Sequence, residues 1–240
     1  MLLYYIRHGD PIYDPDSLTP LGHRQAESVA KRLALFGVDK VYASTSNRAI
    51  QTAQPTCEML KKEAILLDFA NEKYAWQEFS VEADGMRTWI FRPRKYRRLF
   101  ASPNIRKLGD TWYEHPDLSP YKDNFKMGLE RISRETDNFL LSLGYERIPE
   151  DGIYRVVKPN EERIALFAHE GFGYLFISYI LNIPYPIFTI HFEMCHSGMT
   201  VIEFPSQDNE LCIPKVLTYS NNGHLYHDNL PLDFNHRIKF

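Results

Sequence analysis

The segment Leu2–Asp10, LLYYIRHGD, joins an apolar run to two basic side chains and a glycine. Its first five residues are apolar or aromatic, which is typical of a short strand buried on both faces. The run ends at Arg7 and His8, and Gly9 then allows the chain to turn. Two side chains that need charge or hydrogen-bond partners are thus expected at the end of a buried strand. Other segments of the chain must supply those partners.

Length and composition indicate a globular protein with one substantial core. The chain has 240 residues, of which 44% are hydrophobic, enough for a single core that carries an inserted lobe. The net charge of −3 gives no overall basic field, so we expect no nucleic-acid partner. The three cysteines lack a CxxC spacing and are interpreted as reduced thiols. The chain start has no basic leader and no apolar stretch is long enough to span a bilayer, so we expect a cytoplasmic protein without a membrane partner.

Strand-like and helix-like patterns alternate on both sides of an irregular middle. A helix is predicted over 19–37, with Thr19 as N-cap, Pro20 in the first turn and Gly37 as its end. This alternation predicts an α/β fold, a three-layer α/β/α sandwich around a mostly parallel mixed sheet. Strands are predicted at 40–44, 64–69 and 163–168, helices at 47–62, 125–147 and 172–182, and three closely spaced antiparallel strands at 188–194, 198–204 and 213–220.

Three strand ends carry the side chains of a predicted site. YYIRHGD and ALFAHEG both end in histidine and glycine, and KVYASTSNRA leads through a polar loop into a helix that begins near Asn47. Ligands of α/β proteins bind beyond the carboxyl ends of the strands, so Arg7, His8, Arg48 and His169 are expected at one edge. Two arginines, two imidazoles and a helix N-terminus favour a phosphate-like dianion.

Four fragments occur in order along the chain: RHG, LTPLGHRQA, ASTSNRAIQTA and AHEGF. Each lies at a predicted strand end or helix start, and together they closely resemble the histidine phosphatase superfamily, also called the phosphoglycerate mutase-like proteins. The resemblance covers residues 2–60 and 164–225 and is loose in the middle third. It implies one domain over 1–240 with the mutase-like fold, and a substrate cap inserted over 72–147.

The resemblance also implies roles for the residues at the strand ends. His8 would be the nucleophile and would form a phosphohistidine. Arg7, Arg48 and His169 would bind the phosphoryl oxygens and stabilise the charge that develops in the transition state. Phosphoryl transfer depends mainly on positioning and electrostatics, so the arginines can act without a metal ion or a cofactor.

The leaving group needs a proton, and in this superfamily the acid follows the third strand. Glu72 has that place in the segment NEK, and Glu78 and Glu82 are alternatives. Trp76 stands where the superfamily usually has glycine. The neighbouring stretch 87–107 carries eight Lys or Arg residues with aromatic residues between them. It is interpreted either as a solvated surface or as a lid for a second anionic or planar part of the substrate.

These observations predict a metal-independent phosphatase that acts on a small phosphomonoester. A phosphoglycerate-type mutase is an alternative, although FSVEADGMRTW does not resemble the mutases after the acid. A non-catalytic phosphate-binding module on the same fold is another alternative, and a metallohydrolase using His8, Asp10 and His169 is a third. We expect Asp10 to cap the loop that follows it. His191 and His196 are an alternative set of metal ligands with His8 and Asp10, but we expect them to be ordinary, because they form no H-x-H or H-x-x-x-H pair. The sequence predicts neither the substrate nor the oligomeric state.

Overall fold

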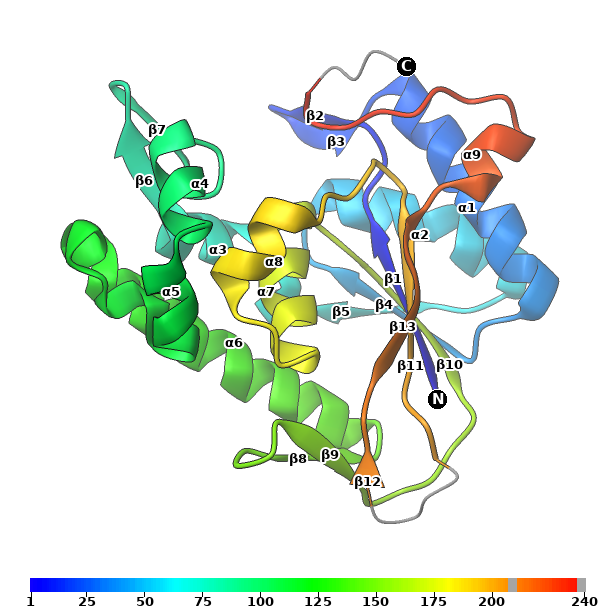
Figure 1. Cartoon of the computed structure of the whole chain (residues 1–240). Helices are drawn as coiled ribbons and strands as arrows, with labels where there is room; N and C mark the ends of the chain where they lie inside the picture. The colour runs from blue at the N-terminus through cyan, green and yellow to red at the C-terminus, as the bar shows by residue number, and fades with distance from the viewer. Residues whose placement is uncertain (207–210, 237–240) are drawn as a thin grey trace.

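A computed structural model describes residues 1–206 and 211–236 (Figure 1). Its centre is a six-stranded sheet in the order β13-β11-β1-β10-β4-β5. Strands β1, β10, β4 and β5 pair in parallel, and β11 runs antiparallel to both β1 and β13. The predicted mostly parallel mixed sheet is therefore confirmed. The strands are β1 (Leu2–Arg7), β4 (Lys40–Ser44), β5 (Ala64–Leu67), β10 (Arg163–Ala168), β11 (Met199–Glu203) and β13 (Lys215–Asn221).

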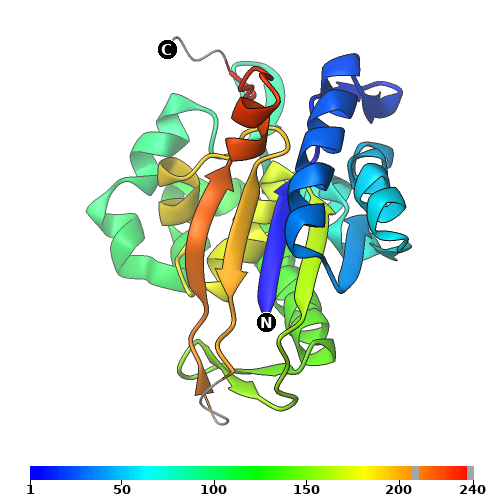
Figure 2. The same cartoon turned by 90° about the vertical axis from the view of Figure 1, so that its right-hand side faces the viewer.

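Helices cover both faces of this sheet, which confirms the predicted three layers. Figure 2 shows the orange β13 and β11, the blue β1 and the yellow-green β10 side by side between the helices. One face carries α1 (Pro20–Phe36), α2 (Asn47–Leu60) and α9 (Gly223–His227). The other face carries α3 (Glu72–Phe79), α6 (Lys122–Ser142), α7 (Glu170–Ile180) and α8 (Tyr185–His191). None of the described helices is long and apolar enough to cross a membrane.

The sequence of β1 explains how one strand contributes to both layers. Side chains alternate between the two faces of a strand. Tyr4 and Ile6 belong to the hydrophobic cluster that includes residues of α1, whereas Leu3 and Tyr5 belong to the cluster that includes Phe172 of α7. All four are buried, which is why the run LLYYI is apolar on both faces.

The predicted helix over 19–37 is confirmed at both ends. The side chain of Thr19 accepts a hydrogen bond from the backbone N–H of Gly22, and Pro20 is the first helical residue. Gly37 has a positive φ of 75° and donates its N–H to Leu33 at the end of the helix. This cap fixes the start of α1 beside the loop that follows β1.

The prediction of a strand at 188–194 is wrong. Residues up to His191 form α8, and residues 192–194 are outside any strand. Prolines stand at 184 and 186, at the N-cap and in the first turn of α8, where proline favours a helix start. The alternation of large and polar residues in FTIHFEM suggested a strand, but Phe188 and Thr189 are both buried, as neighbours on a short packed helix can be.

The middle of the chain packs onto the main core. Trp112, Phe125 and Phe79 lie in the same hydrophobic cluster as Leu3 and Tyr5 of β1. In Figure 1 the hairpin of β6 (Ser80–Ala83) and β7 (Met86–Trp89), together with α4 (Arg94–Phe100) and α5 (Pro103–Leu108), lies on the side of the sheet that carries α3, α7 and α8. The extent of the cap, 72–147, stays a prediction. The remaining described strands are β2 (Pro11–Tyr13), β3 (Asp16–Leu18), β8 (Tyr145–Ile148), β9 (Ile153–Val156) and β12 (Leu211–Cys212). Three 3₁₀ helices are also described, η1 (Asp68–Ala70), η2 (Gly109–Glu114) and η3 (Pro116–Tyr121).

Candidate active site

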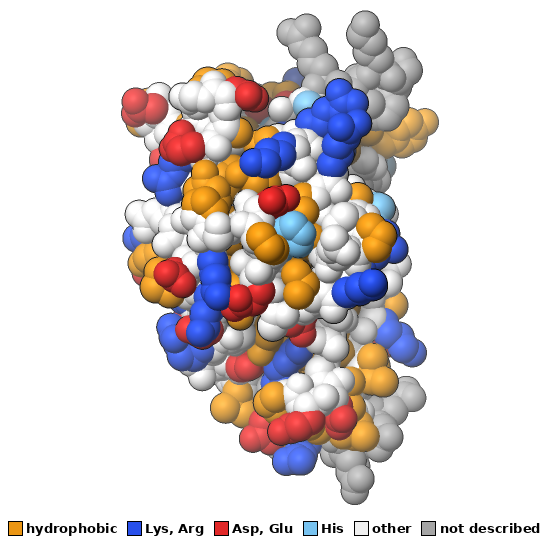
Figure 3. Space-filling view, turned by 60° about the vertical axis from the view of Figure 1, so that its left-hand side comes forward, with side chains coloured by type: hydrophobic (Ala, Val, Ile, Leu, Met, Phe, Trp, Pro, Cys, Tyr) orange, Lys and Arg blue, Asp and Glu red, His pale blue; other side chains and the backbone are white. Residues whose placement is uncertain are grey.

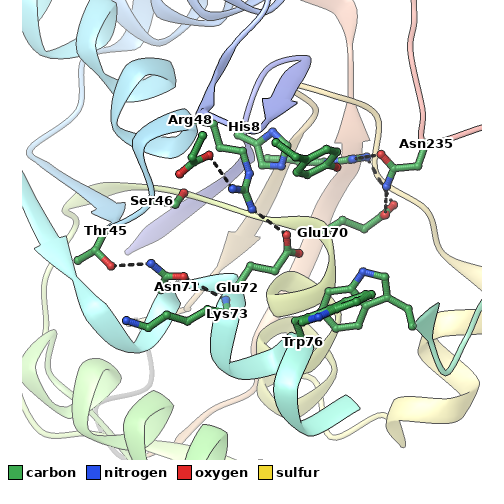
Figure 4. A pocket seen from close by; sticks show the side chains of 14 residues that line it. His8, Thr45, Ser46, Arg48, Asn71, Glu72, Lys73, Trp76, Glu170 and Asn235 are labelled. Atoms are coloured by element: carbon green, nitrogen blue, oxygen red, sulfur yellow. Dashed lines mark hydrogen bonds and ion pairs between the residues drawn. The ribbon is translucent and has the colours of Figure 1, made fainter. Parts of the chain in front are cut away.

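The carboxyl ends of β1, β10 and β4 bring four of the predicted site residues together. Arg7 ends β1 and His8 follows it, His169 follows β10, and Arg48 lies in the first turn of α2 after β4. Because β10 pairs in parallel with both β1 and β4, these ends meet at one edge of the sheet. Arg7, His8 and Arg48 line a cavity of about 550 Å³ (Figure 4).

His8 is held in a single tautomer at the floor of this cavity. Its Nδ1 lies 2.7 Å from the carbonyl oxygen of Gly9, which can only accept, so Nδ1 carries the proton and Nε2 has a free lone pair. The N–H of Gly9 donates to Thr52 Oγ1 over 3.0 Å, which fixes this turn against α2. Burial, followed by the charges of His169, Arg7 and Arg48, holds the pKa of His8 well below its usual value. The ring is therefore neutral at physiological pH.

The Arg7 guanidinium is fixed by acceptors from distant segments. Its Nη1 donates to the carbonyl oxygen of Met194 over 2.5 Å, and its Nη2 donates to His196 Nε2 over 2.8 Å and to Asn235 Oδ1 over 2.7 Å. Only 1% of the residue is exposed. Its Nε has no hydrogen-bond partner among the described residues.

Arg48 and His169 are also held by polar neighbours. Arg48 donates from Nη1 to Asp16 over 2.7 Å and from Nη2 to Glu72 over 3.0 Å. His169 Nε2 lies 2.8 Å from Ser44 Oγ, and burial with the two arginine charges keeps the pKa of His169 well below its usual value. Within the described ranges, Arg48 Nε and His169 Nδ1 are buried without a hydrogen-bond partner. Most buried polar atoms of folded proteins have one, so these unpaired atoms need an explanation.

Glu72 is the candidate acid that the structure brings to this site. It is the first residue of α3, where Asn71 caps the helix, and its carboxylate points toward Arg48 in Figure 4. Its Oε1 accepts from the N–H of Gly171 over 2.8 Å, and its Oε2 accepts from Arg48. Burial raises the pKa of Glu72, although Arg48 and the Gly171 N–H oppose the shift. The carboxyl is therefore easier to protonate than an exposed glutamate.

The two alternative acids lie elsewhere. Both carboxylate oxygens of Glu78 accept from Arg131 on α6, over 2.6 and 2.7 Å. Glu82 is exposed on β6. Neither residue lines the cavity that His8 lines.

Three residues near the arginines were missed or expected to be ordinary. Glu170 lines the cavity, lies 3.5 Å from Arg7 Nη1 and accepts from Asn235 Nδ2 over 2.7 Å. Its place directly after His169 in AHEGF is a signal that could have identified it. His196, which was not expected to take part in the site, accepts a hydrogen bond from Arg7. Asn235 bridges Arg7 and Glu170, and no local pattern marks it.

Asp10 is held by the loop after β1 and by α1. Its carboxylate accepts from Thr19 Oγ1 over 2.5 Å, and its N–H donates to Gln25 Oε1 over 2.8 Å. It does not line the cavity. It therefore ties the loop after β1 to the start of α1, as expected from the sequence.

Two groups of described residues place potential metal ligands together. The first is His8, Glu72 and His169, whose ligand atoms lie within 4.8 Å of one another. The second is Asp10 with His196 and Asp233, so the trio His8, Asp10 and His169 of the metallohydrolase alternative is split between them.

Neither group suits a divalent cation. The positive charges of two arginines act on the histidines of the first group and oppose a further cation. In the second group, His196 Nε2 accepts from Arg7, so Nδ1 of the neutral ring carries a proton where a lone pair is needed.

Most of the basic side chains of the stretch 87–107 lie at the surface. Only Arg92 is partly buried, and its Nη2 donates to Glu170 Oε2 over 3.1 Å. Figure 3 shows the basic side chains of this side of the molecule interspersed with acidic and hydrophobic ones. The exposed members are Arg87, Arg94, Lys95, Arg97, Arg98, Arg106 and Lys107.

Comparison with known proteins adds to this geometry. Residues 3–95 match the family model described as histidine phosphatase superfamily (branch 1). The chain is 27% identical over 111 residues to a putative phosphoserine phosphatase 2 of Hydrogenobacter thermophilus, and the match covers 39% of this chain and 55% of that protein. It therefore spans about half the length of this curated relative.

Solved structures share the fold over nearly the whole chain. The phosphoserine phosphatase of Entamoeba histolytica in complex with 3-phosphoglyceric acid has a TM-score of 0.58 at 20% identity, over 93% of this chain and 98% of its own. A mycobacterial glucosyl-3-phosphoglycerate phosphatase in complex with VO3 also has a TM-score of 0.58, at 15% identity, over 92% and 99%. At 20% and 15% sequence identity, the similarity to these two structures shows a shared fold and no more.

Proposed function

We propose that the chain, whose residues 3–95 match the histidine phosphatase superfamily model, is a metal-independent phosphatase that hydrolyses a small phosphomonoester through a phosphohistidine at His8. One observation carries the proposal. The neutral ring of His8 has its Nδ1 proton fixed by Gly9 and its Nε2 free, among Arg7, Arg48 and His169. This is the arrangement that a nitrogen nucleophile for phosphorus requires.

The first half-reaction transfers the phosphoryl group to the enzyme. The Nε2 lone pair of His8 forms a bond to phosphorus while the phosphorus–oxygen bond to the leaving group breaks, and the bonding electrons stay on that oxygen. Protonated Glu72 supplies its proton to the same oxygen, so a neutral alcohol leaves. Arg7, Arg48 and His169 stabilise the charge on the phosphoryl oxygens.

The second half-reaction restores the enzyme. Water attacks phosphorus, the bond between phosphorus and His8 Nε2 breaks with its electrons returning to the ring, and ionised Glu72 accepts the proton of the water. Inorganic phosphate then leaves, and both side chains have recovered their starting protonation states. Glu72 can act as the acid in the first half-reaction and as the base in the second, because burial raises its pKa while Arg48 still stabilises its ionised form.

The substrate is proposed to be a small phosphomonoester. The names of the relatives, a putative phosphoserine phosphatase and a glucosyl-3-phosphoglycerate phosphatase, support this class. The proposed cap, 72–147, contributes Glu72, Trp76 and Trp89 to the cavity that His8 lines. The cap would therefore surround the part of the substrate that leaves.

A direct assay tests this function against its alternatives. The purified chain is incubated with p-nitrophenyl phosphate in excess chelator, and the release of inorganic phosphate is measured. We expect release at the same rate with and without chelator. No release would favour a non-catalytic phosphate-binding module, and loss of activity in chelator would favour a metallohydrolase. A parallel incubation with phosphoglycerate isomers would show interconversion without phosphate release if the chain were a mutase.

A further inference from the structure

The proposed chemistry fixes where the leaving group must lie. In phosphoryl transfer the attacking and leaving atoms lie roughly in line through phosphorus, so the leaving oxygen lies on the side opposite His8 Nε2. That oxygen must also be within reach of its proton donor, Glu72. The organic part of the substrate therefore lies beside Glu72, and the walls of the cavity at this place determine which alcohols fit.

Two tryptophans form those walls. Trp76 is one helical turn after Glu72 on α3, and Trp89 ends β7; both line the cavity (Figure 4). A Cβ placed on Gly171 would lie 2.5 Å from Trp89 Cη2 and 3.0 Å from Glu72 Oε1, so the Trp89 ring and the Glu72 carboxylate lie against the same Cα atom. The indole of Trp89 therefore lies beside the carboxyl group that would protonate the leaving group.

The two indoles meet nearly at a right angle, and other side chains pack against both rings. Their ring centroids are 5.1 Å apart and their planes are inclined by 80°. Trp89 stacks on Phe91 with centroids 5.5 Å apart, and the Arg87 guanidinium lies 5.8 Å from the centroid of the Trp76 ring. Both indoles line the cavity, so a planar group bound at this corner would contact them in the stacked or edge-to-face geometries that aromatic rings prefer.

Two of the three cations near this corner have acidic partners, whereas Arg87 donates only to Ser80 Oγ and the Gln77 carbonyl oxygen among the described residues. Lys73, which also lines the cavity, lies 3.6 Å from Asp68, and Arg92 donates to Glu170. A leaving group with its own carboxylate would have to compete with Asp68 for Lys73, or with Glu170 for Arg92. The cavity of about 550 Å³ is within the range of pockets that bind whole small molecules, so a ring fits beside the phosphate.

We propose that the corner formed by Trp76 and Trp89 is a leaving-group subsite for a planar ring, and that the substrates are phosphomonoesters of alcohols or phenols that carry an aromatic ring. This inference rests on the proposed phosphatase function, because that chemistry places the leaving group beside Glu72. It separates this chain from phosphatases whose leaving groups are small and have no ring.

A binding experiment with inert analogues tests the subsite without requiring turnover. Phosphonates have a phosphorus–carbon bond that this chemistry does not cleave, so the affinities of 2-phenylethylphosphonate and ethylphosphonate can be measured by calorimetry. We expect the wild-type protein to bind the phenyl compound at least about tenfold more tightly. In Trp76→Leu and Trp89→Leu the ratio should fall toward one, and in Trp76→Phe most of it should remain.

Phe192→Leu is the matched control, because Phe192 is a partly exposed aromatic residue that does not line this cavity, and it should keep the wild-type ratio. Equal affinities of the wild-type protein for both phosphonates would overturn the subsite, and so would a ratio that survives both leucine substitutions. Phosphate release from p-nitrophenyl phosphate reports separately on the phosphatase function. Release together with equal phosphonate affinities would leave that function standing and reject the aromatic subsite.

Discussion

Glu72 Oε2 accepts a hydrogen bond from Arg48 Nη2 over 3.0 Å, so the proposed acid and a proposed phosphate-binding side chain are in direct contact. A phosphate dianion that binds Arg48 competes with the carboxylate for the same guanidinium. It also adds negative charge beside Glu72, which favours the protonated carboxyl. Substrate binding therefore helps to put the proton on the group that must donate it.

Replacement of Glu72 by glutamine removes the donated proton while keeping the shape of the side chain. For alkyl phosphates, whose leaving group needs that proton, we expect kcat/KM to fall by about 10²- to 10³-fold. For p-nitrophenyl phosphate, whose leaving group is stable as an anion, the loss should be much smaller. Steady-state kinetics with both substrates measures the difference, and Glu78→Gln is the matched control. Equal losses for the two substrates would show that Glu72 only binds or positions.

In the pH profile of kcat/KM, we expect a single loss of activity that is caused by an ionising group of the enzyme. This limb of the profile should lie on the alkaline side. His8 must be neutral, and because burial holds its pKa well below the usual value of about 6.5, no loss of activity is expected near that pH. Glu72 must be protonated in the first half-reaction, so activity should fall as pH rises through its raised pKa. Rates corrected for ionisation of the substrate test this, and Glu72→Gln should abolish the limb. A fall in activity centred near pH 6.5 on the acid side would contradict a neutral, buried His8.

Arg92 should affect substrate binding, whereas its exposed neighbours should not. Arg92→Gln removes a partner of Glu170 and leaves that carboxylate more free to repel a phosphate near Arg7. We expect kcat/KM to fall about tenfold, as loss of a charged hydrogen bond does. Arg94→Gln, at an exposed position of the same basic stretch, should stay within about twofold. If both variants lost activity equally, the whole stretch would act as a charged lid.

Gly22 should be required for stability, because α1 begins in close contact with the loop after β1. A Cβ at Gly22 would overlap the carbonyl oxygen of Asp10 and lie 3.0 Å from its nitrogen. Both contacts are backbone atoms, so Gly22→Ala should lower the free energy of unfolding by about 1–3 kcal/mol. Urea unfolding measures this. Gly223→Ala is the control, since its closest contact is a side-chain oxygen at 3.3 Å, and an equal loss there would contradict the steric account.

The sequence predicted the parts of the fold and site that depend on local pattern. Arg7, His8 and His169 could be placed together because apolar strands that end at one sheet edge bring their following residues together. The helix start at Thr19 and Pro20 could be predicted from capping chemistry. Glu72 was predicted because of its position after the third strand, and the structure places it against Arg48.

Contacts between distant segments could not be predicted in this way. Asn235 lies 228 residues from Arg7 and contacts it through a segment without helical or strand periodicity. The role of His196 depends on the path of the chain after α8, where a strand was wrongly predicted. The Trp76–Trp89 corner likewise requires α3 and β7 to pack side by side, and neither sequence segment specifies the other.

The most direct test of the central claim is detection of the phosphoryl group on His8. The chain is mixed with a fast aryl phosphate, quenched in alkali within the first turnovers, and mapped by mass spectrometry of its peptides. We predict an alkali-stable phosphoryl group on His8 that decays as inorganic phosphate appears, and none in His8→Ala, which should also lose turnover by orders of magnitude. A phosphoryl group on another residue, or near-normal turnover of His8→Ala, would contradict the mechanism.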